Sequence, residues 1–117
     1  MPIIENAATG IAIGSSLVGL RPIITHQRVE FAILSMEQIV NQAAKWSYMF
    51  GGQSSPSITI RGIINRGGEQ GAQHSQALHA WFAHVPGLRV VMPSTVADAR
   101  DLLIASVLCP DPVMYID

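Results

Sequence analysis

The sequence has little charge. Asp, Glu, Lys and Arg make up 13% of its 117 residues, well below the roughly 25% of an average domain, and the net charge is −1. The chain therefore lacks the basic field that attracts nucleic acids or anionic membranes. Because a small domain has a large surface for its volume, a hydrophobic content of 49% leaves much of that surface apolar. This predicts a homo-oligomer or a part of a larger assembly. The alternative is a very compact, poorly soluble monomer.

The sequence also lacks the features of a secreted or membrane-spanning chain. Its one cysteine, Cys109, excludes an internal disulfide and fits a reducing compartment. The apolar stretch 7–20 is shorter than the roughly 20 residues of a membrane span. No Lys or Arg precedes this stretch, as one would in a signal peptide. We expect a soluble, cytoplasmic protein with neither a membrane nor a nucleic acid as a partner.

Common catalytic and metal-binding motifs are missing as well. There is no G-x-x-x-x-G-K-[ST] phosphate loop, no complete G-x-G-x-x-G and no G-x-S-x-G. His79 and His84 are five residues apart, not the four of a helical metal pair, and His26 has no Cys or His close by. We therefore expect no zinc site.

What the sequence does contain is an alternation of helical and strand-like segments. Apolar periodicity predicts helices over 6–19, 33–49, 75–84 and 96–108, and strands over 21–25, 57–61, 88–92 and 113–116. The alternation predicts an α/β fold, with a parallel sheet of about four to five strands and helices on both faces. Residues 26–31 are expected to be a simple connection.

Helix ends and helix contacts have their own signals. Asn6 is the expected cap of the first helix, and a hydroxyl of Ser94 or Thr95 is the expected cap of the last. Gly10 and Gly14 share one face of the first helix, where each glycine costs roughly 1 kcal/mol relative to alanine. This cost predicts a compensating close contact with another backbone.

The segment 61–74 is rich in glycine and lies between a predicted strand and a predicted helix. Such a loop belongs at the carboxyl edge of the sheet, where open α/β folds bind ligands. Arg61, Asn65 and Arg66 could hold an anion there, and a flexible crossover loop explains the glycines equally well. His74 stands at the entrance of the following helix, and a lone histidine is more often structural than catalytic. On the residues alone, Glu5 is an ordinary acid of a first helical turn.

Several stretches of the sequence together resemble one known family. They are Pro2-Ile-Ile-Glu-Asn-Ala7, Gly19-Leu-Arg-Pro-Ile23, Glu37-Gln-Ile-Val-Asn-Gln-Ala-Ala-Lys45, Tyr48-Met-Phe-Gly-Gly52, Ala72-Gln-His-Ser-Gln76, Trp81-Phe-Ala-His-Val-Pro-Gly-Leu88 and Val90-Val-Met-Pro-Ser94. The chain resembles the transketolase-type pyrimidine-binding domain in the beta subunit of the decarboxylating component of 2-oxo acid dehydrogenases. The resemblance extends over essentially the whole chain.

This resemblance implies thiamine diphosphate chemistry, in which the cofactor reacts and the protein orients it. The glutamate at the position of Glu5 would hydrogen-bond the aminopyrimidine ring and promote the tautomer that activates the cofactor. Phe31 would pack on the face of that ring, and His74 would line the channel for the substrate or the lipoyl arm. A structural monovalent cation, potassium in particular, is implied at a region that matches Ile58, Ser106, Val107, Cys109 and Asp111.

The sequence also departs from the family pattern. We expect residues 1–117 to form one pyrimidine-binding-type domain that lacks the family's first strand–helix unit and its C-terminal domain. The Gly-Asp-Gly…Asn signature that holds the cofactor's diphosphate through magnesium is absent, so a partner domain, such as an alpha-type subunit, is implied. Thr25-His26-Gln27 replaces more acidic and apolar residues, and Cys109-Pro110 replaces frequent Asp and Asn.

Three functions follow from these observations. The first is a part of a 2-oxo acid dehydrogenase that supplies the activating glutamate and is inactive alone. The second is a non-enzymatic oligomeric binding or assembly module derived from this domain. The third is a module that binds another small anion at the glycine-rich segment.

Overall fold

The protein forms one α/β unit built on a four-stranded parallel sheet. The computed structural model describes residues 2–65 and 70–117. The strands are β1 (Ile23–His26), β2 (Thr59–Gly62), β3 (Arg89–Val91) and β4 (Val113–Ile116). They lie in the order β1-β2-β4-β3, and every neighbouring pair is parallel. The predicted fold class is confirmed, with boundaries shifted by one or two residues for three of the strands.

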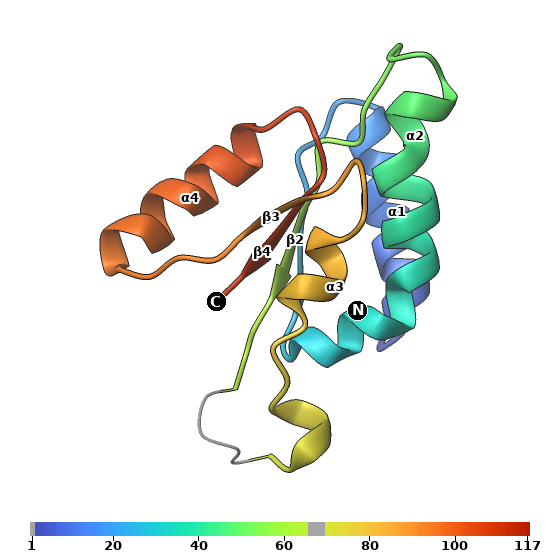
Figure 1. Cartoon of the computed structure of the whole chain (residues 1–117). Helices are drawn as coiled ribbons and strands as arrows, with labels where there is room; N and C mark the ends of the chain where they lie inside the picture. The colour runs from blue at the N-terminus through green and yellow to red at the C-terminus, as the bar shows by residue number, and fades with distance from the viewer. Residues whose placement is uncertain (1, 66–69) are drawn as a thin grey trace.

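Helical segments cover the two faces of the sheet unequally. α1 (Glu5–Leu17) and α2 (Ala44–Met49) lie on one side, and α4 (Val96–Leu108) lies on the other (Figure 1). The main core joins the sheet to the first side, where Ile13 of α1, Ile39 and Phe82 of α3 (His79–Ala83) meet strand residues such as Ile60. The only residue that α4 buries is Ser106. One face of the sheet therefore carries most of the core, while the α4 side remains thinly packed.

The predicted helix over 33–49 begins earlier and changes its winding along its length. It consists of the 3₁₀ segment η1 (Val29–Ser35), the π-helical segment η2 (Glu37–Ala43) and α2. Residues 29–31 are therefore helical, and the prediction of a simple connection over 26–31 was wrong. Gly51 and Gly52, with φ values of 62° and 76°, end the run as expected.

The ends of α1 and α4 show which capping predictions hold. The predicted cap Asn6 is wrong, because Ile4 is the N-cap without any side-chain cap bond and Glu5 is the first helical residue. At α4 the prediction is confirmed: the Thr95 hydroxyl accepts from the backbone N–H of Asp98, whose carboxylate accepts from the backbone N–H of Thr95.

The glycine pair of α1 does not pack against another backbone within the chain. A methyl group on Gly10 would meet the side chain of Gln38 at 3.2 Å, and one on Gly14 would meet nothing within 4 Å. Gly14 lies on an exposed apolar face of α1 together with Ala7, Ile11 and Val18. The predicted close backbone contact is therefore wrong for the single chain, and this face is open.

The predicted helix over 75–84 is shorter in the structure. A 3₁₀ turn, η3 (Ala72–His74), is followed by irregular backbone until α3 begins at His79. The backbone N–H of Gln76, just before α3, donates to the side chain of Glu30 at 2.7 Å. The backbone that leads into α3 is therefore bound by a distant side chain, a contact that the local apolar pattern does not contain.

Candidate functional site

The candidate site lies at the carboxyl edge of the sheet, where the parallel strands end together. A cavity of about 520 Å³ is lined there by Glu5 of α1, by His26 at the end of β1 and by Phe31 of η1. An adjoining hollow of about 660 Å³ is lined by Phe31, Arg28 and His74. Phe31 lines both spaces. The fold thus brings together three residues that lie far apart in the sequence, Glu5, Phe31 and His74.

Glu5 is half-buried at the start of α1 and lines the first cavity. Its place in the first helical turn also lets its charge interact favourably with the helix dipole. The ordinary structural role and the functional role are therefore compatible in one position. The fold also places apolar side chains beside the Glu5 carboxylate, because Ile3, Ile4 and Ala8 line the same cavity.

His26 is a site residue that the sequence-based reasoning missed. The burial pattern of β1 places Ile24 and His26 on the inner face, and His26 is only 3% exposed. Burial lowers the pKa of the His26 imidazole, and the negative charge of Glu5 opposes this shift. The imidazole is therefore neutral near pH 7. The alternation lies in the burial along β1 and not in the residue types of 23–26, so the residue types alone carry no clear signal for His26.

Phe31 and His74 face each other across the junction of the two spaces. Their ring centroids are 5.1 Å apart at an interplanar angle of 35°, within the range of aromatic pairs. Phe31 comes from η1 and His74 from η3, so the pair joins two segments separated by 43 positions. The two residues are thus close enough to form one wall around a planar ligand.

The five residues matched to a cation site already use their oxygen atoms. The carbonyl oxygens of Val107 and Cys109 accept hydrogen bonds from Arg21 Nη1 at 2.8 and 3.1 Å. The Asp111 carboxylate is bound by Arg89, at 2.9 Å from Nε and 2.6 Å from Nη2.

The other two members of that set are engaged too. The Ile58 carbonyl accepts from Val113 N, and the Ser106 carbonyl accepts from Cys109 N. The positive charge of Arg21 at two of these carbonyl oxygens would oppose the binding of a second cation there. Potassium at these residues stays a prediction, and it plays no part in the function proposed below.

In the described part of the glycine-rich segment, the Asn65 side-chain amide is a buried donor without a partner, while the nearby arginine is already engaged. Arg61 is paired with Asp117, with Nη2 and Oδ2 2.6 Å apart, so most of its charge is neutralised. Arg66 lies outside the described residues. Among residues 2–65 and 70–117, no three His, Cys, Asp or Glu side chains are close enough to hold a metal ion.

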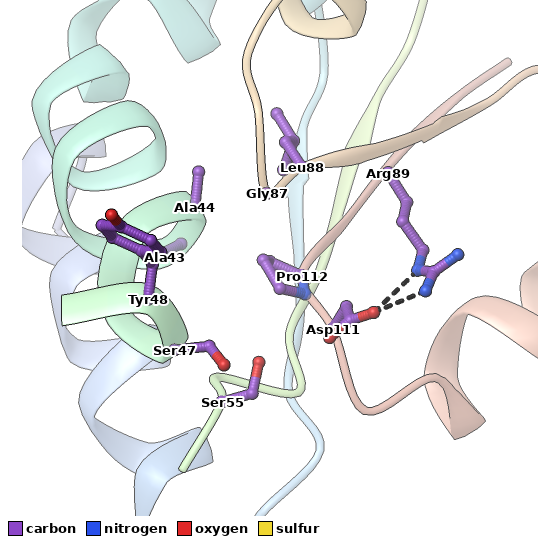
Figure 2. A pocket seen from close by; sticks show the side chains of 10 residues that line it. All are labelled: Ala43, Ala44, Ser47, Tyr48, Ser55, Gly87, Leu88, Arg89, Asp111 and Pro112. Atoms are coloured by element: carbon purple, nitrogen blue, oxygen red, sulfur yellow. Dashed lines mark hydrogen bonds and ion pairs between the residues drawn. The ribbon is translucent and has the colours of Figure 1, made fainter. Parts of the chain in front are cut away.

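A further cavity of about 480 Å³ lies at the opposite, amino edge of the sheet. Figure 2 shows Tyr48 and Ala44 of α2 on one side and the Arg89–Asp111 ion pair on the other. Its charged groups neutralise each other, and its other polar side chains are the hydroxyls of Ser47, Tyr48 and Ser55. The side chains that could bind or react with a ligand, Glu5, His26 and His74, therefore lie at the carboxyl edge.

No helix within the described ranges is long and apolar enough to cross a membrane. Large apolar side chains are nevertheless exposed on several elements. They include Ile11 of α1 and its C-cap Val18, with 73% and 81% exposed, and Ile104 and Leu108 of α4, with 53% and 64% exposed.

Comparison with known proteins identifies the relatives of this chain. The family model for the transketolase pyrimidine binding domain matches residues 1–116. The chain is 44% identical over 116 residues to a pyruvate dehydrogenase E1 component subunit beta of Rhizobium meliloti and covers 25% of that protein. It is 45% identical over 116 residues to a mitochondrial pyruvate dehydrogenase E1 component subunit beta-2 of Oryza sativa subsp. japonica, of which it covers 31%. Each of these two alignments includes 99% of the chain.

Two further similarities complete the comparison. The chain is 44% identical over 114 residues to the beta subunit of an acetoin:2,6-dichlorophenolindophenol oxidoreductase of Cupriavidus necator; the match includes 97% of the chain and 34% of that subunit. Its fold matches a solved split gene transketolase, described as an inactive beta4 tetramer, with a TM-score of 0.79 and 24% identity. That match covers 99% of this chain and 35% of the other. The chain thus spans about a quarter to a third of the length of its relatives.

Proposed function

Because the chain belongs to the transketolase pyrimidine-binding domain family, we propose that it provides the pyrimidine half of a thiamine diphosphate site. We propose that the enzyme to which it contributes this half-site is a decarboxylating component of a 2-oxo acid dehydrogenase. The observation that carries this proposal is the carboxyl-edge cavity in which Glu5, His26 and Phe31 meet. An open α/β sheet binds its ligand at this edge.

The residues of the cavity fit a heteroaromatic ring. Glu5 offers a carboxylate that can hydrogen-bond a ring nitrogen, and Phe31 offers a flat apolar face for stacking. When bound, thiamine diphosphate would supply the carbanion chemistry of decarboxylation. The part of this chain would be to orient the ring, to exclude water with Ile3, Ile4 and Ala8, and to hold a proton at the Glu5 carboxylate.

The diphosphate end of the cofactor needs another domain. The described residues hold no carboxylate cluster for magnesium, and Arg61 is occupied by Asp117. An alpha-type subunit that contributes the metal and diphosphate site is therefore part of the proposal. We further propose that residues 1–117 act as a single domain in a homo-oligomeric or mixed assembly. The exposed face of α1 with Ile11, Gly14 and Val18 supports such an assembly, because water-exposed apolar helix faces usually mark contacts.

The second candidate is a non-enzymatic oligomeric module derived from the same domain. Its support is the same exposed apolar surface, which requires a partner chain but no cofactor. The two functions differ in what they require of Glu5. A module needs Glu5 only as a first-turn acid, whereas an enzyme part needs its carboxylate in the cavity.

The experiment compares Glu5→Gln with the parent chain, each mixed with an alpha-type subunit, thiamine diphosphate and magnesium. Decarboxylation of pyruvate and of a branched 2-oxo acid is followed with an artificial electron acceptor. We expect Glu5→Gln to lose about 100-fold or more of the rate, the usual contribution of an acid–base group. The matched control is Glu37→Gln, since Glu37 is exposed and bonds only Gln42 among the described residues.

Three outcomes would contradict the proposal. No partner-dependent turnover by the parent chain would assign the chain to the module, and equal, measurable rates for the parent chain and Glu5→Gln would contradict the role of Glu5. Turnover by the parent chain without any partner would contradict the requirement for a second domain. Calorimetric titration of the assembly with thiamine diphosphate, with inorganic diphosphate as the control, separates loss of binding from loss of rate.

A further inference from the structure

The stretch 28–31 holds the segment 70–76 at three separate points. The Arg28 guanidinium donates to the side-chain oxygen of Gln70. Glu30 Oε1 accepts from the backbone N–H of Gln76 at 2.7 Å. The ring of Phe31 lies 5.1 Å from the ring of His74. Three of four consecutive residues at the start of the long helical run thus contact one short segment.

The middle contact differs from the other two because its acceptor is buried. Glu30 is 9% exposed, so its carboxylate is almost entirely removed from water. A hydrogen bond from a backbone N–H to a carboxylate is roughly twice as strong as a neutral one. Glu30 Oε2 is buried without a hydrogen-bond partner among the described residues, so the bond from Gln76 N to Oε1 is the one that offsets the cost of burying this carboxylate. The bond to Gln76 N therefore holds the backbone of residue 76 from within the protein and is not a surface contact.

The segment that this bond holds has little structure of its own. Residues 75–78 are neither helical nor extended in a sheet, and η3 spans only Ala72–His74. Local backbone bonds therefore do not determine where His74 lies. Its position depends on the contacts with the stretch 28–31, and Glu30 supplies the one that acts directly on the backbone.

We propose that Glu30 is a positioning residue of this site: its buried carboxylate, bound to the backbone of Gln76, holds His74 against Phe31. Glu30 acts through the backbone two residues after His74 and does not itself line either of the two site cavities. The part that His74 plays toward a ligand rests on the function proposed above. The geometry itself does not, and it can be tested on the chain without any cofactor.

The test uses nuclear magnetic resonance of the histidine rings in the isolated chain. We expect the Phe31 ring current to shift the His74 ring protons upfield, and Phe31→Leu should identify that shift by abolishing it. We expect Glu30→Met, which keeps the volume but removes the acceptor, to lose most of the upfield shift. Glu30→Gln keeps an acceptor oxygen and retains most of it. Glu37→Met is the control, because Glu37 is an exposed acid of the same helical run.

A measurement on the parent chain guards against a variant that fails to fold. The amide hydrogen of Gln76 is expected to exchange about tenfold more slowly than that of Ala77, as a charge-assisted bond predicts. Unchanged His74 shifts in folded Glu30→Met, or equal exchange at Gln76 and Ala77, would overturn the proposal. Failure of the assembly to bind thiamine diphosphate would instead overturn the proposed function and leave the role of Glu30 in placing His74 intact.

Discussion

Gly62 connects the packing of the sheet to the geometry of the site. It is the last residue of β2, and a methyl group on it would lie 2.9 Å from Val29 Cγ2 and 3.0 Å from Met114 Cε. Met114 can turn its flexible end away, but Val29 is β-branched, fully buried and tied to Ile63 O through its own N–H at 2.9 Å. In Gly62→Ala the added methyl group therefore pushes on the start of η1, which carries the site-forming stretch 28–31.

The size of the effect follows from the steric contact. Overpacking of this kind costs about 1–3 kcal/mol of unfolding free energy, a large part of the roughly 5–15 kcal/mol that stabilises a domain. Val29→Ala alone removes two buried methyl groups and should cost about 2 kcal/mol. In the double variant the new methyl group occupies the space that Val29 vacates. The double variant should therefore be more stable than the sum of the two losses predicts, by about 1 kcal/mol or more.

Urea unfolding of the parent chain, the two single variants and the double variant measures this coupling. Circular dichroism and tryptophan fluorescence should give coincident transitions if unfolding is two-state. The site is monitored in parallel through the ring shift of His74, which Gly62→Ala should reduce and the double variant should restore. Losses that add to within about 0.5 kcal/mol would show that Gly62 and Val29 do not interact and would refute the reasoning.

Two further predictions concern the turn before β3 and the buried histidine. Gly87 has a φ of 92°, and a methyl group on it would lie 1.9 Å from the Ala44 carbonyl oxygen, so Gly87→Ala should cost about 3 kcal/mol or more. Gly51→Ala is the control, since Gly51 has a φ of 62° and a methyl group on it would meet nothing within 4 Å. This substitution should lower the free energy of unfolding by only about 1–2 kcal/mol. Equal losses of free energy for the two variants in urea unfolding would contradict the predicted clash. Burial lowers the pKa of His26 in the folded state, so the unfolded chain binds more protons as the pH falls below about 6.5 and stability decreases. Thermal unfolding at pH 7.5 and 5.5 should show a smaller decrease for His26→Phe than for the parent chain, and an identical decrease would argue against a buried neutral His26.

Part of the site could be predicted from single residues and part could not. Glu5, Phe31 and His74 were identified from the family resemblance, and the structure places all three at the carboxyl edge. Their roles toward a ligand stay predictions. His26 was missed, although alternation along β1 puts it on the same face as Ile24. Glu30 had no signal at all, because its partner Gln76 is 46 positions away.

The helical run 29–49 shows the same limit in the backbone. Apolar spacing indicated a helix there, and the glycines at 51 and 52 indicated its end. The early start and the change from 3₁₀ to π winding follow from contacts that a period of 3.6 residues does not contain. One such contact is the bond between Val29 N and Ile63 O, which joins the start of the run to the end of β2.

The sequence by itself determined the kinds of element, their order and hence the parallel α/β class. It could do so because apolar periodicity and turn residues act locally and need no knowledge of distant partners. It also indicated a surface poor in charge, and α1 and α4 do expose apolar side chains. Only the tertiary structure brought Glu5, Phe31 and His74 to one edge of the sheet and added His26 to them. Burial of His26, the Glu30–Gln76 bond and the Arg21 contacts with the end of α4 join residues that are far apart in the chain. Such contacts depend on how the elements pack, and no local pattern encodes them.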